Sequence, residues 1–182
     1  LRQQITPHFM FNVLNHINIL MQDNVPLASS LLEKYSDILR YQLYNGQKEL
    51  ISLEQEIEFL QNYIAIENIR WEDKLTVSTE WKVEDGNIGF PPLLLLTFIE
   101  NAFKHASHTP TEKGQVQIRF KQNAHHILLE VGNTSSSHLQ RPGTGLGLTN
   151  TVKRLDILFH KKYQLSVNQT DSYYQTSLSI EI

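Results

Sequence analysis

The sequence of 182 residues contains no cysteine. This absence excludes a disulfide scaffold, a thiolate zinc site, an iron–sulfur cluster and a cysteine nucleophile, and it is consistent with a reducing compartment. Glycine and proline are scarce, with 8 and 6 residues, which excludes a collagenous or low-complexity chain. The longest apolar run lies near Leu93–Leu96, far short of the roughly 20 residues of a membrane-spanning helix. No secretory signal is visible and Leu1 stands in the middle of a pattern, so we expect a soluble piece excised from a longer protein.

Basic residues are scarce in the first half of the chain. Residues 1–90 hold 7 Lys and Arg against 13 Asp and Glu, whereas residues 91–182 hold 9 against 6. A basic second half favours a phosphate-bearing ligand there, although ordinary surface variation would also explain the asymmetry. The net charge of −3 and the lack of a basic stripe with interleaved aromatic residues argue against a nucleic-acid-binding module.

The first 50 residues carry the three-and-four spacing of amphipathic helices. The first apolar stripe contains Met10, Val13, Leu14, Ile17, Leu20 and Met21. The second contains Leu27, Leu31, Leu32, Tyr35, Ile38 and Leu39. A break at Asn24–Pro26 and a left-handed cap at Asn45–Gly46 would delimit a helical hairpin. Because two helices cannot bury both stripes alone, we expect the hairpin to form half of a dimeric four-helix bundle.

From residue 51 onward the periodicity changes. Ser52 followed by Gln55 is typical of a capping box and predicts a third helix that runs towards Arg70. Five later segments alternate apolar and polar residues, as half-buried strands do, with helices expected between them at Pro92–Ala106 and Gly147–Phe159. The sequence therefore predicts an α+β protein, with a helical hairpin at residues 1–50 and a two-layer α/β sandwich at residues 51–182.

Polar residues end the apolar helix expected at Pro92–Ala106. Asn101, Lys104 and His105 share one helix face with His108. An amide oxygen is a suitable ligand for Mg²⁺, and a lysine is suited to phosphate charge. Taken alone, this pattern is also typical of a helix end that emerges into solvent.

A glycine-rich segment precedes the last expected helix. Gly143, Gly145 and Gly147 alternate with other residues, and the segment matches neither the Rossmann fingerprint nor the P-loop. Glycines allow backbone N–H groups to approach phosphates, and the N-terminus of the following helix adds a favourable dipole. The 13 residues Asn133–Gly145 are typical of a lid, although the motif alone would also fit a flexible loop before a helix.

The third motif opens the first helix. Pro7 begins or kinks this helix, and His8 follows it directly. A histidine flanked by aromatic residues is usually a packing or surface residue, but neutral imidazole is a competent nucleophile near neutral pH. The residues alone therefore leave both interpretations of His8 open.

In this order, Pro-His-Phe-x-Phe-Asn, Glu-Asn-Ala-x-Lys-His and Gly-x-Gly-Leu-Gly-Leu resemble the motifs of the LytS-type sensor histidine kinases. Further matches extend the resemblance to nearly the whole chain: Leu53 with Glu56, then Tyr63, Glu67 and Arg70, and Asn150 with Arg154-Leu155. The ATP-binding domain of this family is of the GHKL or Bergerat type, shared with gyrase and the MutL mismatch-repair ATPases. The resemblance implies a hairpin for dimerisation and histidine phosphotransfer, followed by an ATP-binding catalytic domain.

The resemblance also implies roles for single residues. His8 would accept the phosphoryl group from Mg-ATP by in-line attack on the γ-phosphoryl group, with Glu100 as the catalytic base. The other residues would hold the nucleotide and its metal: Asn101 as the Mg²⁺ ligand, Lys104, His105 and the lid residues Gly143, Gly145, Leu146 and Gly147. The phosphoryl group would then pass to the receiver aspartate of a response regulator.

One position departs from the family pattern. The strand ending at Gly132 should lead into an aspartate followed by glycines, but it leads into Asn133 and a run of hydroxyl residues. The carbonyl of Asn133 accepts the same hydrogen bond from the adenine amino group without charge assistance, so we expect weaker nucleotide binding. The glycine-threonine pair of the last strand is also replaced, by Gln175-Thr176. These departures leave an alternative, a catalytically weak or inactive pseudokinase that acts as a dimeric nucleotide-sensing module.

The resemblance further implies partners and a location. We expect a homodimer through the hairpin, a response regulator as the phosphotransfer partner and no direct contact with nucleic acid. A membrane-embedded sensor region is expected upstream of Leu1, which would make the chain the cytoplasmic domain of an inner-membrane-anchored protein. A metal-binding protein is a poorer alternative for the eight histidines, because neither His105 with His108 nor His125 with His126 comes with a third ligand.

Overall fold

The computed structural model describes residues 6–136 and 146–182, which form two compact units. The first unit contains the residues up to Trp71 together with Gly86–Leu93, and the second contains Glu72–Asp85 and Leu94–Ile182. The domain border expected after residue 50 stays a prediction, since compactness alone does not define units that fold separately. Within the described ranges, no helix is both long enough and apolar enough to cross a bilayer.

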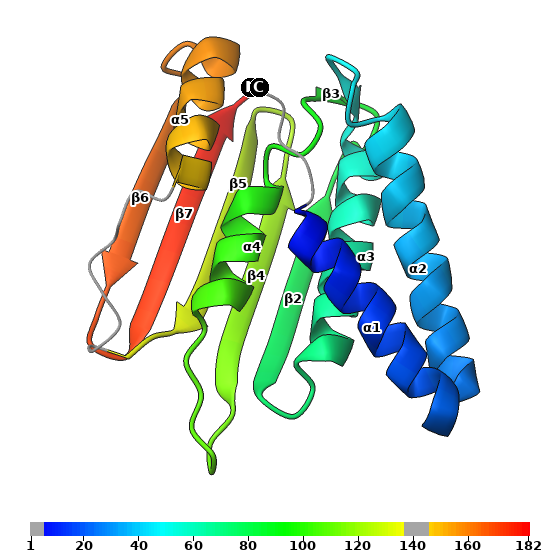
Figure 1. The fold of residues 1–182 in the computed structure, drawn as a ribbon. Helices are drawn as coiled ribbons and strands as arrows, with labels where there is room; N and C mark the ends of the chain where they lie inside the picture. The colour runs from blue at the N-terminus through cyan, green and yellow to red at the C-terminus, as the bar shows by residue number, and fades with distance from the viewer. Residues whose placement is uncertain (1–5, 137–145) are drawn as a thin grey trace. The chain divides into compact units, whose positions relative to one another are not determined.

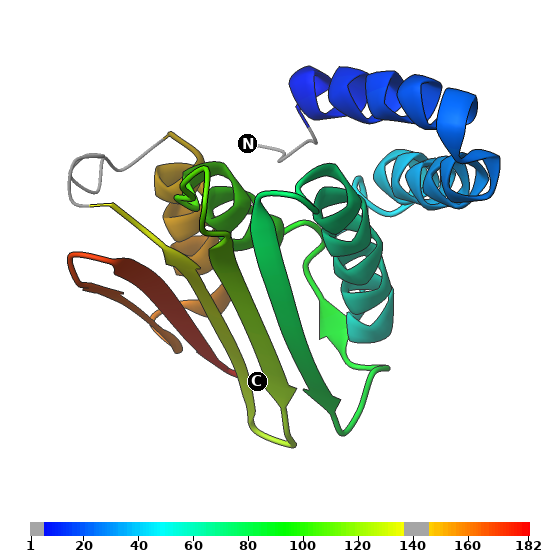
Figure 2. The same ribbon diagram turned by 90° about the horizontal axis from the view of Figure 1, so that it is seen from below.

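Two antiparallel helices open the first unit (Figures 1 and 2). Helix α1 spans Pro7–Asp23 and begins where Thr6 Oγ1 accepts a hydrogen bond of 3.3 Å from Phe9 N. Helix α2 spans Val25–Tyr44, and Asn24 alone separates it from α1. The Asn24 side chain caps α2 by accepting a bond of 3.1 Å from a backbone N–H in its first turn. The predicted helical hairpin is therefore present, with Pro7 starting rather than kinking its first helix.

Only part of the predicted apolar stripe is buried within the chain. The buried side chains of the two helices are Phe9, Val13, Ile17, Ala28, Leu31, Tyr35, Ile38 and Tyr41. Leu14 and Met21 also belong to the predicted stripe, but they are 45% and 61% exposed. Helix α2 and the contact of α1 with helix α3 (Leu53–Arg70) together cover too narrow an arc of α1 to bury the whole stripe. The hairpin therefore leaves a second apolar face uncovered by the described residues.

Helix α3 spans Leu53–Arg70 and follows the two-residue strand β1, Ile51–Ser52, which pairs antiparallel with β3, Gly89–Phe90. The predicted capping box is confirmed, with Gln55 N donating to Ser52 Oγ and Ser52 N donating to Gln55 Oε1. The left-handed cap predicted at the end of α2 is wrong. Asn45 has a φ of −97° there and donates its backbone N–H to Tyr41 O, so a regular helical bond closes the last turn.

A buried carboxylate joins three segments of the first unit. Glu56 is 0% exposed, and its Oε2 accepts hydrogen bonds from the Tyr41 hydroxyl of α2 and from Leu93 N, the latter at 2.9 Å. Leu93 has a φ of 59°, a left-handed conformation that a leucine rarely adopts. The bond to Glu56 holds this backbone in place, and the strain explains why the helix predicted from Pro92 starts only at Leu96.

The second unit is a five-stranded sheet with two helices on one face (Figures 1 and 2). The strand order is β2-β4-β5-β7-β6, and only the β2–β4 pair is parallel. The strands are β2 (Leu75–Val83), β4 (Gly114–Gln122), β5 (His126–Thr134), β6 (Tyr163–Gln169) and β7 (Tyr173–Glu181). The helices are α4 (Leu96–His105) and α5 (Leu146–Phe159). All five predicted strands are present, and the α+β class is confirmed.

Strand register places the buried residues of the sheet in continuous rows. Ile118 of β4 pairs with Val131 of β5, which pairs in turn with Thr176 of β7. Because alternate residues of a strand share one face, Asn133 lies on the same face as Leu129 and Val131. This face is the core face, and Asn133 is only 2% exposed. The buried face of β5 therefore ends in a buried amide.

Candidate functional site

The predicted phosphoacceptor lies at the start of the first unit. His8 is the second residue of α1 and its side chain is exposed. The side-chain amide nitrogen of Asn12, one turn further along, lies 3.2 Å from His8 Nδ1 and 3.3 Å from Nε2. The first turn of α1 has no acidic side chain, and the N-terminus of a helix carries partial positive charge. The position thus suits an accessible nucleophile that becomes an anion after it has reacted.

The start of α1 rests on a group of polar side chains from α3. Phe9 stacks on Tyr63 with ring centroids 4.8 Å apart, which joins the two helices directly beside His8. Tyr63 Oη donates to Glu67 Oε1 at 3.4 Å, and Arg70 Nη1 forms an ion pair with the same oxygen at 2.9 Å. Trp71 Nε1 donates to Glu67 Oε2 at 2.8 Å. Tyr63, Glu67, Arg70 and Trp71 are called the carboxylate cluster below.

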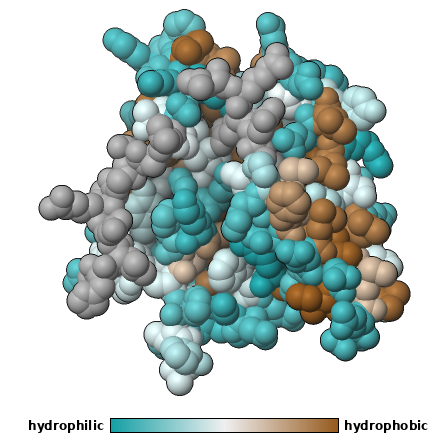
Figure 3. Space-filling model, in the orientation of Figure 1, coloured by the Kyte–Doolittle hydropathy of each residue, from teal (hydrophilic) through white to brown (hydrophobic). Residues whose placement is uncertain are grey.

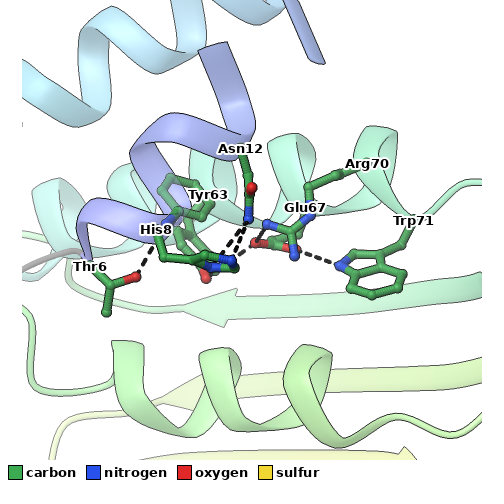
Figure 4. A network of polar contacts seen from close by, with 8 residues as sticks. Thr6, His8, Asn12, Tyr63, Glu67, Arg70 and Trp71 are labelled. Carbon is green, nitrogen blue, oxygen red and sulfur yellow. Dashed lines mark hydrogen bonds and ion pairs between the residues drawn. The ribbon is translucent and has the colours of Figure 1, made fainter. Parts of the chain in front are cut away.

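The geometry of the carboxylate cluster follows from helical spacing. Its four members lie on one side of α3 and around its C-terminal end because they are separated by four, three and one residues. Figure 4 shows the His8 ring pointing towards this cluster, with the Asn12 side chain above the ring. Burial raises the pKa of the Glu67 carboxyl, and Arg70 and the two hydrogen-bond donors oppose this shift. Glu67 is therefore a buried acid with three donors next to the predicted phosphoacceptor.

Helix α4 carries the amide and basic residues predicted to bind the nucleotide. Glu100 and Asn101 are half-buried, whereas Lys104 and His105 are exposed in the last turn, where positive charge stabilises a helix. Partial burial lowers the pKa of His105, and the charge of Lys104 lowers it further. His108 does not belong to this face as predicted, because α4 ends at His105 and the chain then becomes extended.

A hydrogen bond between two buried threonines joins α4 to the helix that follows the glycine motif. Thr151 Oγ1 of α5 donates to Thr97 Oγ1 of α4 at 3.0 Å. A methyl group placed on Gly147 would lie 3.4 Å from Thr97 Cγ2, so the first turn of α5 packs against the same threonine. Asn101 lies one turn beyond Thr97 on α4. The structure therefore brings the start of α5 to the part of α4 that carries Asn101.

Asn133 lies near the end of β5, next to the segment that follows α4. Its Nδ2 donates to Thr134 O at 2.9 Å. Thr134 Oγ1 donates to Ser107 O at 2.8 Å, and Ser107 N donates to Thr134 O at 2.9 Å, which ties the segment after α4 to this strand end. Thr176 is buried on the neighbouring strand β7. It pairs with Val131, two residues before Asn133, and lies on the same face of the sheet as Asn133. The second unit thus gathers two buried amide and hydroxyl side chains beside the C-terminal end of α4.

The remaining predicted site residues are placed only in part. Gly143 and Gly145 lie outside the described residues, and Leu146 is the first residue of α5. Gly147 is exposed in the first turn of that helix. Across the described part of the chain, no three histidine, aspartate or glutamate side chains form a group that could hold a metal ion.

Two features of these regions were not predicted from the sequence. The Thr97–Thr151 bond joins residues 54 positions apart, and no local pattern indicates such a pair. Thr176 was considered only as part of an incomplete glycine-threonine pair. Its alternation with Leu178 and Ile180 on the core face was the available signal that this hydroxyl is buried.

Comparison with known proteins identifies relatives of the chain in sequence and in fold. The model of the histidine kinase family matches residues 1–75. The sensor histidine kinase BtsS of Escherichia coli is 32% identical over 184 residues, which cover 99% of this chain and 32% of BtsS. The sensor protein LytS of Staphylococcus saprophyticus is 29% identical over 195 residues, which cover 99% of this chain and 33% of LytS. The chain thus spans about a third of the length of these relatives.

Solved structures share the fold at low sequence identity. The histidine kinase domain of the blue-light activated kinase from Erythrobacter litoralis superposes with a TM-score of 0.54 at 18% identity, covering 97% of this chain and 88% of that domain. The histidine kinase AdeS of Acinetobacter baumannii gives a TM-score of 0.50 at 15% identity, covering 98% and 86%. Residues 1–75 thus match the histidine kinase family, and the chain has the fold of solved histidine kinase domains. Over nearly its whole length, the chain is similar to sensor proteins named LytS, at about 30% identity.

Proposed function

We propose that the chain is the catalytic segment of a sensor histidine kinase that phosphorylates His8 from Mg-ATP and passes the phosphoryl group to the receiver aspartate of a response regulator. The observation that carries this proposal is the position of His8, exposed in the first turn of α1 in a chain of the LytS type. The alternative of a pseudokinase is not favoured by the relatives, which are named as sensor histidine kinases and sensor proteins.

The buried end of β5 fits an adenine ring. The amide nitrogen of Asn133 donates a hydrogen bond to Thr134 O. The amide oxygen of Asn133 can therefore accept a hydrogen bond from the exocyclic amino group of adenine. The nearby hydroxyl of Thr176 can both donate and accept. These side chains are neutral, and we therefore expect moderate rather than tight nucleotide binding.

The polar end of α4 fits the phosphates and their cation. Mg²⁺ prefers oxygen ligands and is commonly held by one or two protein groups together with substrate phosphates, so a single amide such as Asn101 is an adequate protein ligand. Bound there, Mg²⁺ would offset the negative charge of the phosphate groups. Lys104 and His105 are placed one turn further on, at the exposed end of α4, where they can contact phosphate oxygens.

The transfer itself requires little covalent chemistry from the protein. The lone pair of a His8 ring nitrogen attacks the γ-phosphorus, the N–P bond forms, and the bond to the bridging oxygen breaks as ADP leaves with its electron pair. Asn12 contributes by limiting the orientation of the imidazole, since its amide nitrogen lies 3.2 Å and 3.3 Å from the two ring nitrogens. A hydrogen bond from Asn12 to the attacking nitrogen breaks before the lone pair of that nitrogen reaches phosphorus. Glu100, on α4, is the proposed base and would accept the proton that leaves the other ring nitrogen of His8.

A homodimer through α1 and α2 is part of the proposal. Several large apolar side chains of the hairpin are exposed, among them Phe11, Ile19, Met21 and Leu43 at 59–66%. Figure 3 shows apolar side chains gathered over the part of the surface formed by α1 and α2. A second copy of the hairpin would cover these residues in a four-helix bundle. We also propose an upstream membrane-anchored sensor region, as the relatives are sensor proteins.

The proposal is tested by labelling with γ-³²P-ATP and Mg²⁺. We expect an acid-labile, base-stable phosphate on the parent chain and none on His8→Gln, with nucleotide binding unchanged in both. His16→Gln is the matched control, because His16 lies on the same helix two turns later and should label like the parent. Persistent labelling of His8→Gln would refute the site. Nucleotide binding without labelling of the parent would support the pseudokinase instead.

A further inference from the structure

We propose that Arg70 is the counter-charge for the phosphoryl group on His8, and that Glu67 is the positioning residue that holds Arg70 for this role. The inference rests on the proposed phosphorylation of His8 and assigns a role to a part of α3 that the transfer step above does not use.

Helix α1 is held against α3 in a fixed position. Phe9 follows His8 directly, is only 4% exposed, and stacks on Tyr63 at 4.8 Å. A buried, stacked neighbour limits the movement of the first turn of α1. Figure 4 shows that His8 consequently lies on the side of α1 that faces the carboxylate cluster.

The guanidinium group of Arg70 is immobilised by its neighbours. Arg70 Nη1 lies 2.9 Å from Glu67 Oε1, and its central carbon lies 5.1 Å from the centre of the Trp71 ring. The same indole donates to the other carboxylate oxygen of Glu67 at 2.8 Å. Two different contacts therefore fix the guanidinium plane, and one residue, Trp71, holds both members of the ion pair.

The two charges of the Glu67–Arg70 ion pair differ in exposure. The Glu67 side chain is 3% exposed, whereas the Arg70 side chain is 23% exposed. The anion of the pair is thus enclosed and the cation reaches the surface. A guanidinium has five N–H donors, and its only ionic partner among the described residues uses Nη1. The remaining donors can serve a phosphoryl group, which carries nearly two negative charges at neutral pH.

The alternative role for Arg70 is simply to neutralise buried Glu67. The two roles differ in one measurable respect, because a neutralising arginine acts on folding and a counter-charge acts on the phosphorylated form. The equilibrium constant between ATP with free His8 and ADP with phosphorylated His8 reports the second effect alone, provided that both forms are folded. It is measured on the full chain by labelling with ATP and titrating with ADP.

We expect Arg70→Gln to lower this equilibrium constant about tenfold, as one charge-assisted hydrogen bond would, and Arg70→Lys to retain most of it. Arg40→Gln is the matched control, since Arg40 forms a similar ion pair with Asp37 three residues away on α2, where it is exposed. An equilibrium constant within twofold of the parent value for Arg70→Gln would overturn the inference.

A double variant covers the case in which Arg70→Gln fails to fold. Glu67→Gln with Arg70→Gln removes both charges and leaves no uncompensated buried carboxylate. We expect this variant to fold and to show the same tenfold reduction. Recovery of the parent equilibrium constant would show that Arg70 only neutralises Glu67, and the inference would be wrong.

A nucleotide-free readout separates this inference from the proposed kinase activity. Phosphoramidate phosphorylates histidine chemically, and the ³¹P resonance that is absent from His8→Gln identifies phosphorylated His8. We expect Arg70→Gln to move this resonance and Arg40→Gln to leave it in place. An unmoved resonance would contradict the role of Arg70 even if ATP labelling succeeds, whereas a moved resonance supports it even if ATP labelling fails.

Discussion

The region around His8 and the region around Asn133 use opposite chemistry. The first is built on a buried ion pair with two further donors to Glu67. The second is built on buried neutral groups, the amide of Asn133 and the hydroxyls of Thr97 and Thr151. Charged groups give strong, geometrically defined contacts, whereas neutral hydrogen bonds are weaker. The difference suits the proposed roles of the two regions, in which the first holds a covalently bound anion and the second exchanges a nucleotide.

The largest effect is expected where the charge pair of the first region is broken. Arg70→Ala leaves the carboxylate of Glu67 buried without its cation, and we expect it to lower the free energy of unfolding by about 3 kcal/mol at neutral pH. The loss should shrink as the pH falls towards 4.5. Burial already raises the folded-state pKa of Glu67 above the usual value of a glutamate, and losing Arg70 raises this pKa further, so acid removes the unpaired charge.

Urea denaturation of Arg70→Ala at several pH values measures this loss. Arg40→Ala, which breaks an exposed ion pair, should cost little at any pH. A loss for Arg70→Ala that is independent of pH would contradict the assignment of Glu67 as the buried partner. Nucleotide binding should be unchanged, which distinguishes this region from the one around Asn133.

The next effect concerns catalysis and the second region only. Asn101→Ala removes the proposed protein ligand of Mg²⁺, and we expect the initial rate of labelling to fall about a hundredfold. Nucleotide affinity measured without Mg²⁺ should change much less. Asn68→Ala, an exposed asparagine on α3, serves as the control and should label at the parent rate. Equal losses with and without Mg²⁺ would argue against a metal ligand at this position.

A smaller effect is expected when charge is introduced into the neutral region. Asn133→Asp provides a charged acceptor for the adenine amino group, and we expect about tenfold tighter binding of ADP in calorimetric titration. The same change places a carboxylate beside Thr134 O, where Asn133 now donates, so the nucleotide-free protein should melt at a lower temperature. Asn168→Asp, exposed on β6, should alter neither property. Unchanged or weaker ADP binding by Asn133→Asp would remove Asn133 from the adenine site.

The smallest effect is expected at the joint between the two helices of the second unit. Thr151→Val removes the donor to Thr97 and keeps the shape of the side chain, and we expect a loss of about 1 kcal/mol in the free energy of unfolding. A double-mutant cycle with Thr97→Val measures how much of this loss belongs to the bond itself. Additive losses would show that the two hydroxyls do not stabilise one another.

Local structure was largely predictable from the sequence because it depends on neighbours along the chain. The capping box at Ser52 and Gln55 involves residues three positions apart, and so does the pair of Glu67 and Arg70. The burial of Asn133 follows from strand alternation. Such features repeat with the period of the helix or strand, and the sequence therefore carries them directly.

Long-range contacts and local strain were not predictable in this way. The bond from Leu93 to Glu56 joins residues 37 positions apart and fixes a left-handed leucine that no turn motif indicates. The order of β5, β7 and β6 in the sheet also depends on packing rather than on any one segment. The incomplete burial of the α1 stripe agrees with the expectation that two helices cannot bury both stripes, but which of its residues stay exposed depends on packing.

The most direct test of the account is to locate the phosphoryl group itself. The parent chain is incubated with Mg-ATP, digested at neutral to alkaline pH to preserve phosphohistidine, and analysed by mass spectrometry. The account predicts one additional phosphoryl group on the peptide that contains His8. A phosphoryl group on any other residue, or an unmodified His8 in a chain that binds Mg-ATP, would contradict it.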